Sequence, residues 1–248
     1  MVIMPFYEEV TAMQNKLSLQ RLRIFSGSTL KLIAVIAMLL DHSALMLSPS
    51  LPFLTMPLLG DKITLSFLMH KIGRLAFPLY CFLISEGFFH TRNQKRYGLR
   101  LLIFALMSEL PFNLLRSGRL FYIGSQNVYF TLFLGVVALF AFENINGNLK
   151  KAVVMLAAML AARFLKVDYG MAGVALILVM YILRSHPAAQ AVVAYPLLSG
   201  GTAAFCAFLP INLYNGQRGF IQSKALQYFF YLFYPVHLLL LWLLRYFL

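Results

Sequence analysis

Long apolar runs separated by short polar or basic links repeat along most of the chain. A helix of about 20 apolar residues is long enough to cross a bilayer. The pattern predicts eight spans, at about residues 30–47, 63–90, 98–115, 127–142, 152–164, 169–183, 191–209 and 225–244. The fifth and sixth runs are shorter than a full crossing, so we expect them to be buried, tilted or partly re-entrant. The sequence therefore predicts an all-α, polytopic integral membrane helix bundle.

The first 29 residues do not share this pattern. They are mixed in polarity and end in the basic residues Lys16, Arg21 and Arg23, without the apolar core and small-residue cleavage site of a signal peptide. We expect residues 1–29 to form a cytoplasmic tail and residues 30–248 to form one membrane domain. Within the second span, Pro78 predicts a kink because proline has no backbone N–H to donate.

The composition supports the membrane prediction. Of the 248 residues, 61% are hydrophobic and 12% are charged, and the mean hydropathy is +0.78. A soluble domain is nearer half apolar and a quarter charged. The net charge of +13 comes from Lys and Arg at the ends of apolar runs. There they can contact anionic headgroups and set topology, and they form no long stripe suited to nucleic acid. We expect the lipid bilayer as a partner and no nucleic acid.

The positive-inside rule gives an orientation. With the N-terminus inside, more than half of the 21 Lys and Arg residues lie on the cytoplasmic side. These are Lys16, Arg21, Arg23, Lys31, Arg92, Lys95, Arg96, Arg100, Lys150, Lys151, Arg184 and Arg245. The bias is modest and is clearest around the first three spans.

Several polar residues lie inside the apolar runs, where ionisable groups are costly and are usually functional. The predicted topology places one set of them at a common level in the outer half of the membrane: Asp41, His42, Arg74, Glu109, Asn127, Asp168, Tyr169, Tyr234 and His237. This convergence predicts an intramembrane polar site. Purely structural roles remain open, since Asp41 could pair with Arg74 and Glu109 could pair within the bundle.

Among these residues His42 is the candidate for proton transfer, because histidine titrates near neutral pH. A structural, hydrogen-bonded histidine is the alternative. Cys81 is a poor nucleophile, because a thiol inside a span without a basic partner stays protonated. No Cys or His spacing typical of a metal site occurs, so we expect no metal.

A second polar set follows the second span near its inner end: Glu86, His90, Arg92, Lys95, Arg96 and Arg100. Glu86 and His90 are spaced to share a helix face. The basic residues could bind phosphates, Arg especially through two parallel hydrogen bonds. From the residues alone, headgroup contact and topology are the preferred explanation, because such clusters are a general feature of cytoplasmic loops.

Short motifs in a fixed order run from about residue 30 to residue 240. They are Leu-Asp41-His42, Ile-Gly-Arg74-Leu-Ala-Phe-Pro78, Glu86-Gly-Phe-Phe-His90-Thr-Arg92, Ser-Glu109-Leu-Pro111-Phe, Gln126-Asn127-Val-Tyr-Phe-Thr131, Asp168-Tyr-Gly170 and Tyr234-Pro-Val-His237-Leu. As an ordered set, they resemble the TraX family. The resemblance implies an integral protein of the bacterial inner membrane, with one transmembrane acyltransferase domain. It implies an acetyltransferase that uses acetyl-CoA to acetylate the N-terminal amine of processed conjugative pilin.

The resemblance also suggests roles for the polar residues. His42 would be the general base, with Asp41 orienting its ring, or would itself carry the acetyl group. Arg74 and Asn127 would stabilise the thioester oxyanion, and Glu109 would hold Arg74 or bind the incoming ammonium. The acetyl-CoA site would comprise Glu86, His90, Arg92, Lys95, Arg96 and Arg100. The pilin would contact Asp168, Tyr169, Tyr234 and His237.

Two other classes of function remain open. A proton-coupled transporter would also need intramembrane Asp, Glu and His residues, although transporters usually show an internal repeat and none is visible here. A non-catalytic partner in pilus assembly would bind pilin without changing it chemically.

Overall fold

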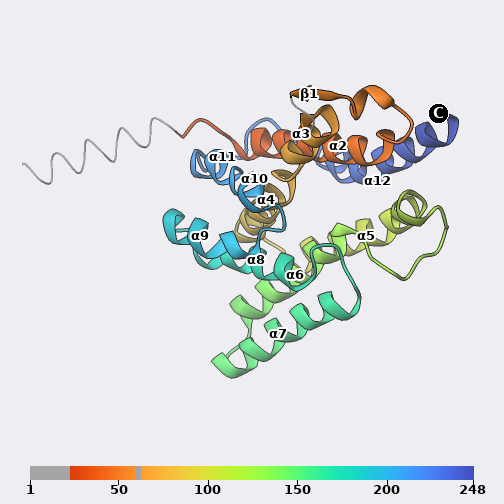
Figure 1. Ribbon diagram of the computed structural model, residues 1–248. Coiled ribbons are helices and arrows are strands. Elements are labelled where there is room, and N and C mark those ends of the chain that lie inside the picture. The colour runs from red at the N-terminus through yellow and green to blue at the C-terminus, as the bar shows by residue number, and fades with distance from the viewer. Residues whose placement is uncertain (1–22, 60–62) are drawn as a thin grey trace, which may run out of the picture.

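The computed structural model describes residues 23–59 and 63–248, and this part of the chain is almost entirely helical (Figure 1). The helices are α2 (Gly27–Leu47), η1 (Pro52–Leu54), α3 (Leu65–Gly73), α4 (Ala76–His90), α5 (Gln94–Ser117), α6 (Val128–Asn144), α7 (Asn148–Phe164), α8 (Gly170–Ile182), α9 (Pro187–Ala194), η2 (Tyr195–Leu197), α10 (Gly201–Phe205), α11 (Phe208–Asn212) and α12 (Lys224–Phe247). A short hairpin of β1 (Pro57–Leu59) and β2 (Ile63–Thr64) precedes α3. Most of the expected tail lies outside the described residues.

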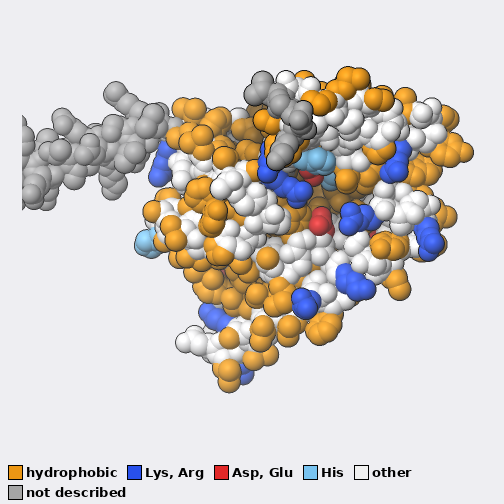
Figure 2. Space-filling view, viewed as in Figure 1, with side chains coloured by type: hydrophobic (Ala, Val, Ile, Leu, Met, Phe, Trp, Pro, Cys, Tyr) orange, Lys and Arg blue, Asp and Glu red, His pale blue; other side chains and the backbone are white. Residues whose placement is uncertain are grey.

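The predicted membrane helix bundle is confirmed. In the part of the chain that the structure describes, four helical segments are long and apolar enough to cross a membrane: Gly27–Leu47, Leu65–His90, Gln94–Ser117 and Lys224–Phe247. Val128–Asn144, Gly170–Ile182 and Gly201–Asn212 are shorter apolar segments. Many large hydrophobic side chains are exposed on the bundle surface (Figure 2), as lipid contact requires.

The helices form two groups. Figure 1 shows α2, α3 and α12 together on one side and α6, α7 and α8 on the other, with α4 and α5 between them. The starts of α2, α5 and α12 and the end of α4 meet at one pocket. We call this end of the bundle the proximal face. The ends of α2 and α12 and the start of α3 mark the opposite, distal face.

The second span is interrupted close to the predicted kink. The helix stops at Gly73 and resumes at Ala76, with Arg74 in the break. Pro78 then falls in the first turn of α4, where its missing N–H costs little. A side chain at position 73 would collide with Asp41, since a Cβ there would lie 2.3 Å from the Asp41 Cβ. Gly73 therefore lets α3 approach α2 closely beside the break.

The seventh predicted span, residues 191–209, is wrong. This segment consists of the short helices α9, η2, α10 and α11, interrupted by prolines and by Gly200 and Gly201. Gly200 packs against the Arg74 stem in the distal half, whereas Asn215 returns to the proximal face and donates its N–H to the Phe25 carbonyl at 2.9 Å. The segment therefore enters the bundle and comes back, because its prolines and glycines cannot sustain one continuous helix.

This re-entrant segment reverses the last span relative to the prediction. Lys31 in the first turns of α2 and Gln227 in the first turn of α12 line the same pocket. At the other ends of these helices, an Arg245 Nη1 lies 3.8 Å from the Met46 sulfur. The two helices therefore run in the same direction. Arg218 belongs to the same face as Lys31, and Arg245 to the opposite face, so the sequence-based sides of both arginines are wrong.

Candidate functional site

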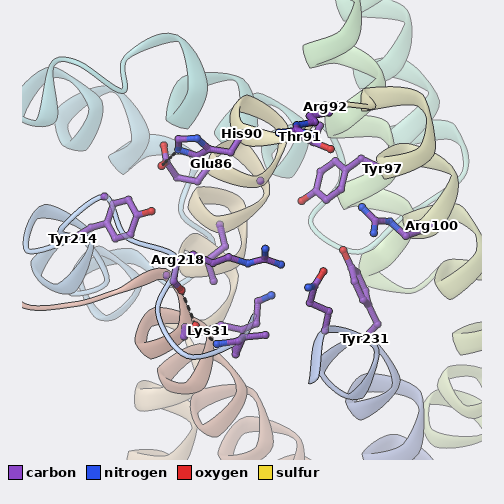
Figure 3. A pocket seen from close by; sticks show the side chains of 17 residues that line it. Lys31, Glu86, His90, Thr91, Arg92, Tyr97, Arg100, Tyr214, Arg218 and Tyr231 are labelled. Carbon is purple, nitrogen blue, oxygen red and sulfur yellow. Dashed lines mark hydrogen bonds and ion pairs between the residues drawn. The ribbon is translucent and has the colours of Figure 1, made fainter. Parts of the chain in front are cut away.

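A pocket of about 560 Å³ opens on the proximal face, between α2, α4, α5 and α12 (Figure 3). Four cationic side chains line it: Lys31 from α2, Arg92 from the α4–α5 link, Arg100 from α5 and Arg218 from the loop before α12. Figure 3 shows Lys31, Arg100 and Arg218 directed into the middle of the pocket, with Arg92 beside Thr91 at one side. The pocket is therefore strongly electropositive.

Arg218 is held in place by backbone contacts between its loop and the start of α2. The Ser28 N–H donates to the Arg218 carbonyl at 2.9 Å, and the Ser28 hydroxyl donates to the same oxygen at 2.6 Å. That hydroxyl also accepts from the Ile221 N–H at 2.8 Å. Gly219 has φ +82°, and a Cβ there would lie 2.3 Å from the Ser26 Oγ, so the loop requires glycine at this position.

The opposite wall of the pocket carries the expected i, i+4 pair. His90 Nε2 lies 3.5 Å from Glu86 Oε2. Tyr214 faces this wall, and its burial together with the Glu86 carboxylate raises the pKa of Tyr214 to about 12. Its phenol is therefore protonated at neutral pH. Tyr97 and Tyr231 complete an aromatic side of the pocket.

The four pocket cations have no acidic counter-ion within ion-pair distance among the described residues. The carboxylate ion pairs in that part of the chain are Asp41–His70 and Glu86–His90. Arg100 Nε is buried and lacks a hydrogen-bond partner in the same part of the chain. A buried donor without a partner is costly, and an anionic ligand would satisfy it. The pocket can therefore bind a polyanion, such as a phosphate-bearing molecule.

The structure brings together four of the six residues proposed for acetyl-CoA from sequence: Glu86, His90, Arg92 and Arg100. Lys95 and Arg96 are exposed outside the lining, and the Lys95 amine lies 6.0 Å from the Phe140 ring centroid. Sequence reasoning missed Lys31, Arg218 and the tyrosines as members of this site. The wrong direction of the last span hid Arg218, and no sequence signal placed it here.

The second candidate region lies in the distal half and centres on a pair of histidines. His42 Nδ1 of α2 is 2.7 Å from His237 Nε2 of α12, and the two rings stack with centroids 5.0 Å apart. His237 Nδ1 is 2.8 Å from the Phe233 carbonyl one turn earlier in α12. The structure thus joins two residues that the sequence placed at a common level but in separate roles.

Asp41 does not contact His42 in this arrangement. Its Oδ1 lies 2.9 Å from His70 Nδ1 of α3. The expected orientation of His42 by Asp41 is therefore absent, because consecutive residues of a helix point to different faces. The alternative pairing of Asp41 with Arg74 is also absent among the described ion pairs, and Arg74 is exposed at the helix break. Sequence reasoning missed His70.

Asn127 joins the ends of two helices. Its Nδ2 donates to Glu109 Oε2 at 2.6 Å and to the Ala105 carbonyl at 2.8 Å. Its Oδ1 accepts from the Tyr129 N–H at 3.1 Å and so caps α6. Both amide protons are used, and Asn127 is fully buried. Glu109 Oε1 is buried and has no hydrogen-bond partner among the described residues, so Asn127 holds a carboxylate with one unpaired oxygen.

Asp168 and Tyr169 form the turn before α8. Tyr169 stacks on Phe77 of α4 with ring centroids 3.5 Å apart. Thr131 donates its hydroxyl to the Asp168 carbonyl. Burial raises the pKa of Asp168 to about 6, and the Asp41 carboxylate adds to this, while Arg116 and Arg74 oppose it. The Asp168 side chain still reaches solvent.

Figure 2 shows a hollow between α3 and the α5–α6 region, with acidic and histidine side chains inside a ring of Lys and Arg.

Tyr234 lies between the histidine pair and Tyr129. Its ring centroid is 6.2 Å from His42 and 5.2 Å from Tyr129, edge to face in the second case. The next residue, Pro235, has no N–H for the Tyr231 carbonyl. The Tyr129 hydroxyl donates to that carbonyl at 2.9 Å instead. The proline is thus accommodated by a neighbouring helix, which also holds Tyr234 in place.

The fold and these two regions define a class: a polytopic membrane protein with an electropositive pocket on one face and a polar cluster in the other half. A family model described as TraX protein matches residues 26–245. The chain belongs to the TraX family. It is similar to a probable fimbrial assembly protein FimC, serogroup H1, of Dichelobacter nodosus, at 32% identity over 246 residues, which covers 88% of this chain and 94% of that protein. No solved structure matches the chain significantly.

Proposed function

We propose that the protein acts in pilus or fimbrial assembly as a membrane-embedded acetyltransferase, which transfers the acetyl group of acetyl-CoA to the N-terminal amine of a processed conjugative pilin. Membership of the TraX family and similarity to a fimbrial assembly protein support the role in assembly. The observation that carries the enzymatic part is the proximal pocket, in which Lys31, Arg92, Arg100 and Arg218 lack acidic partners among the described residues.

The pocket suits the phosphates of acetyl-CoA. Arginine binds phosphate through two parallel hydrogen bonds, and Arg100 has a buried Nε without a partner among the described residues. Tyr97 and Tyr231 offer apolar and aromatic surface beside these charges. Because acetyl-CoA is a cytoplasmic metabolite, this assignment orients the proximal face toward the cytoplasm of a bacterial cell, in the inner membrane.

The distance between the two regions suits this reaction. Lys31 and His42 are separated by about 16 Å along α2, and Tyr231 and His237 by about 9 Å along α12, at the helical rise per residue. The phosphates of acetyl-CoA would remain at the cations while its long pantetheine arm extends between α2 and α12. The thioester would then reach the histidine pair from the proximal side, and the pilin amine would arrive from the distal side.

The distal residues supply the chemistry in this proposal. His42 accepts the proton of the attacking amine, and the Glu109 carboxylate, whose buried Oε1 has no partner among the described residues, binds the incoming ammonium. Asp168, Tyr169 and Tyr234 contact the pilin N-terminus. Arg74, exposed at the helix break, is the candidate to stabilise the oxyanion. Asn127 positions Glu109, since its amide protons are already used.

The direct test combines purified protein in nanodiscs, radiolabelled acetyl-CoA and a peptide matching the mature N-terminus of a conjugative pilin. We expect label on the peptide, and none on a matched peptide whose N-terminus is already blocked. Equilibrium binding of CoA to the same preparation is the companion measurement. If folded protein binds CoA but labels neither peptide nor itself, acetyl transfer is wrong.

A non-catalytic assembly partner is the second candidate, favoured by the similarity to a probable fimbrial assembly protein. That function predicts binding of the pilin peptide with no acetyl transfer. Failure of both CoA binding and peptide labelling, with peptide binding intact, would support it over the enzyme.

A further inference from the structure

The hydrogen-bond distances around His42 and His237 determine which ring nitrogen of each histidine carries a proton. His237 Nδ1 lies 2.8 Å from the Phe233 carbonyl. A carbonyl oxygen only accepts hydrogen bonds, so His237 Nδ1 must carry a proton. In a neutral imidazole the other nitrogen is then an acceptor. His237 Nε2 is therefore unprotonated where it faces His42.

The unprotonated His237 Nε2 in turn fixes the tautomer of His42. His42 Nδ1 lies 2.7 Å from His237 Nε2, so His42 Nδ1 must be the donor. His42 Nε2 is then the unprotonated nitrogen. No hydrogen-bond partner occupies it among the described residues, and the His42 side chain remains partly exposed. The chain of donors and acceptors ends at a free basic nitrogen.

Neutrality of both rings follows from their surroundings. His237 is 4% exposed, and neither ring has a carboxylate within ion-pair distance among the described residues. A buried charge without a partner is costly. Were His237 protonated on both nitrogens, it would donate to His42 Nδ1 and force the opposite tautomer on His42.

We propose that His237 is a positioning residue that holds His42 in the Nδ1–H tautomer through the Phe233 carbonyl, leaving His42 Nε2 free as a proton acceptor. As a statement about acetyl transfer, this rests on the function proposed above. It replaces the arrangement expected from sequence, in which Asp41 orients His42, because Asp41 is committed to His70.

The incoming ammonium first releases one proton to solvent. The neutral amine nitrogen then bonds to the thioester carbonyl carbon, and a second proton passes from this nitrogen to His42 Nε2. The carbon–sulfur bond breaks, and the CoA sulfur leaves as a thiolate with the bonding electron pair. His42 Nε2 returns its proton to that thiolate. While His42 is cationic, its Nδ1–H remains bonded to His237 Nε2, which stabilises the charge without a second proton transfer.

The test is ¹⁵N NMR of histidine-labelled protein in micelles, because the two imidazole tautomers have distinct nitrogen shifts. The chain has five histidines, so His42→Gln and His237→Gln variants assign the signals. We expect both His42 and His237 of the unmodified protein to be Nδ1–H. A His42 found mainly as the Nε2–H form would overturn the proposal, and this measurement needs no acetyl-transfer activity.

Variants at position 237 separate positioning from packing. In His237→Leu, His42 loses its acceptor and should show mixed tautomers, with kcat lowered about 10²-fold and the KM for acetyl-CoA unchanged. In His237→Gln, the amide oxygen can accept from His42 Nδ1, so the Nδ1–H form and much of kcat should return. His70→Gln is the matched control, which should leave the His42 tautomer unchanged.

An unaltered His42 tautomer in folded His237→Leu protein would also overturn the proposal. If the unmodified protein shows the expected tautomers but never acetylates peptide, the proposed function fails while the histidine geometry stands. If the protein acetylates peptide but His237→Leu and His237→Gln lose kcat equally and share one tautomer pattern, the positioning role is wrong while the enzyme assignment stands.

Discussion

The proximal pocket and the distal polar cluster hold their charges in opposite ways. In the pocket, Lys31, Arg92, Arg100 and Arg218 come from four parts of the chain and have no acidic partners among the described residues. In the cluster, most polar groups are already paired, as in Asp41–His70, His42–His237 and Glu109–Asn127.

The difference indicates different tasks. Uncompensated cations at the membrane face can remain hydrated and can exchange a mobile anion. Polar groups at membrane depth must be paired, because an unpaired charge there is costly. Within the part of the chain that the structure describes, His42 Nε2 and the buried Glu109 Oε1 lack hydrogen-bond partners, which suits a region of positioned chemistry. The comparison predicts that variants of the cluster change catalysis or folding, whereas variants of the pocket change binding.

The largest expected effect is on catalysis, from His42→Ala. Loss of the proposed proton acceptor should lower kcat for acetyl transfer by about 10²- to 10⁴-fold, the usual contribution of a general base. The Kd of CoA should stay the same, since the pocket is on the other face. Single-turnover transfer and isothermal titration measure the two quantities. Full activity in folded His42→Ala protein would remove His42 from the mechanism.

The second effect is on binding, from Arg218→Ala. Loss of one hydrogen bond to a charged group is worth about 1.5–3 kcal/mol, which corresponds to a rise of about ten- to a hundred-fold in the Kd of CoA. The kcat at saturating acetyl-CoA should change little. Lys150→Ala, at an exposed position of α7 outside the pocket, is the control. Equal Kd values for the two variants would contradict the pocket assignment.

The third effect is on stability, from Asn127→Ala. This change leaves Glu109 Oε2, the Ala105 carbonyl and the Tyr129 N–H without their partner. Stranding buried polar groups should destabilise the fold by about 1–3 kcal/mol, seen as a lower midpoint of thermal unfolding. Asn144→Ala, at the exposed far end of the same helix, should shift the midpoint much less. A similar shift for both variants would show that the buried network contributes little.

The smallest effect is on pH dependence and concerns Asp168. Its raised pKa of about 6 means that the side chain becomes a carboxylate as the pH rises through 6. A peptide amine has a pKa near 7.7–8.0, so between pH 5 and 7 it is mainly the ammonium form. Attraction between the two should lower the peptide KM a few-fold across this range.

In Asp168→Asn the KM should be independent of pH over the same interval. The Asp168 carboxylate, which favours peptide binding, should have the opposite effect on the stability of the fold. Desolvation disfavours the carboxylate, so the protonated form stabilises the fold by an amount that solvent screening keeps small, and this contribution is lost as the pH rises through about 6. Asp168→Asn protein should therefore gain stability relative to the unmodified protein above pH 6. If the peptide KM of Asp168→Asn still falls between pH 5 and 7, a group other than Asp168 causes the pH dependence.

Hydrophobic periodicity in the sequence was sufficient for the membrane class and for most helices, because apolar length and helical rise are local properties. It also predicted the Glu86–His90 pair, since i, i+4 spacing places two side chains on one helix face. It placed His42, Glu109 and Asn127 in one half of the membrane, and the structure joins His42 to His237 and Glu109 to Asn127 there. Tyr234 and His237 lie in that half although the last helix runs opposite to the predicted direction.

The tertiary structure alone decided which of these residues meet. Depth along a helix does not specify the face that a neighbouring helix covers, so His237 as the partner of His42 and His70 as the partner of Asp41 could not be predicted. The re-entrant segment between α8 and α12 changed the direction of the last helix and moved Arg218 into the pocket. Whether a run of apolar residues crosses or turns back depends on long-range packing around its prolines and glycines, which composition does not record.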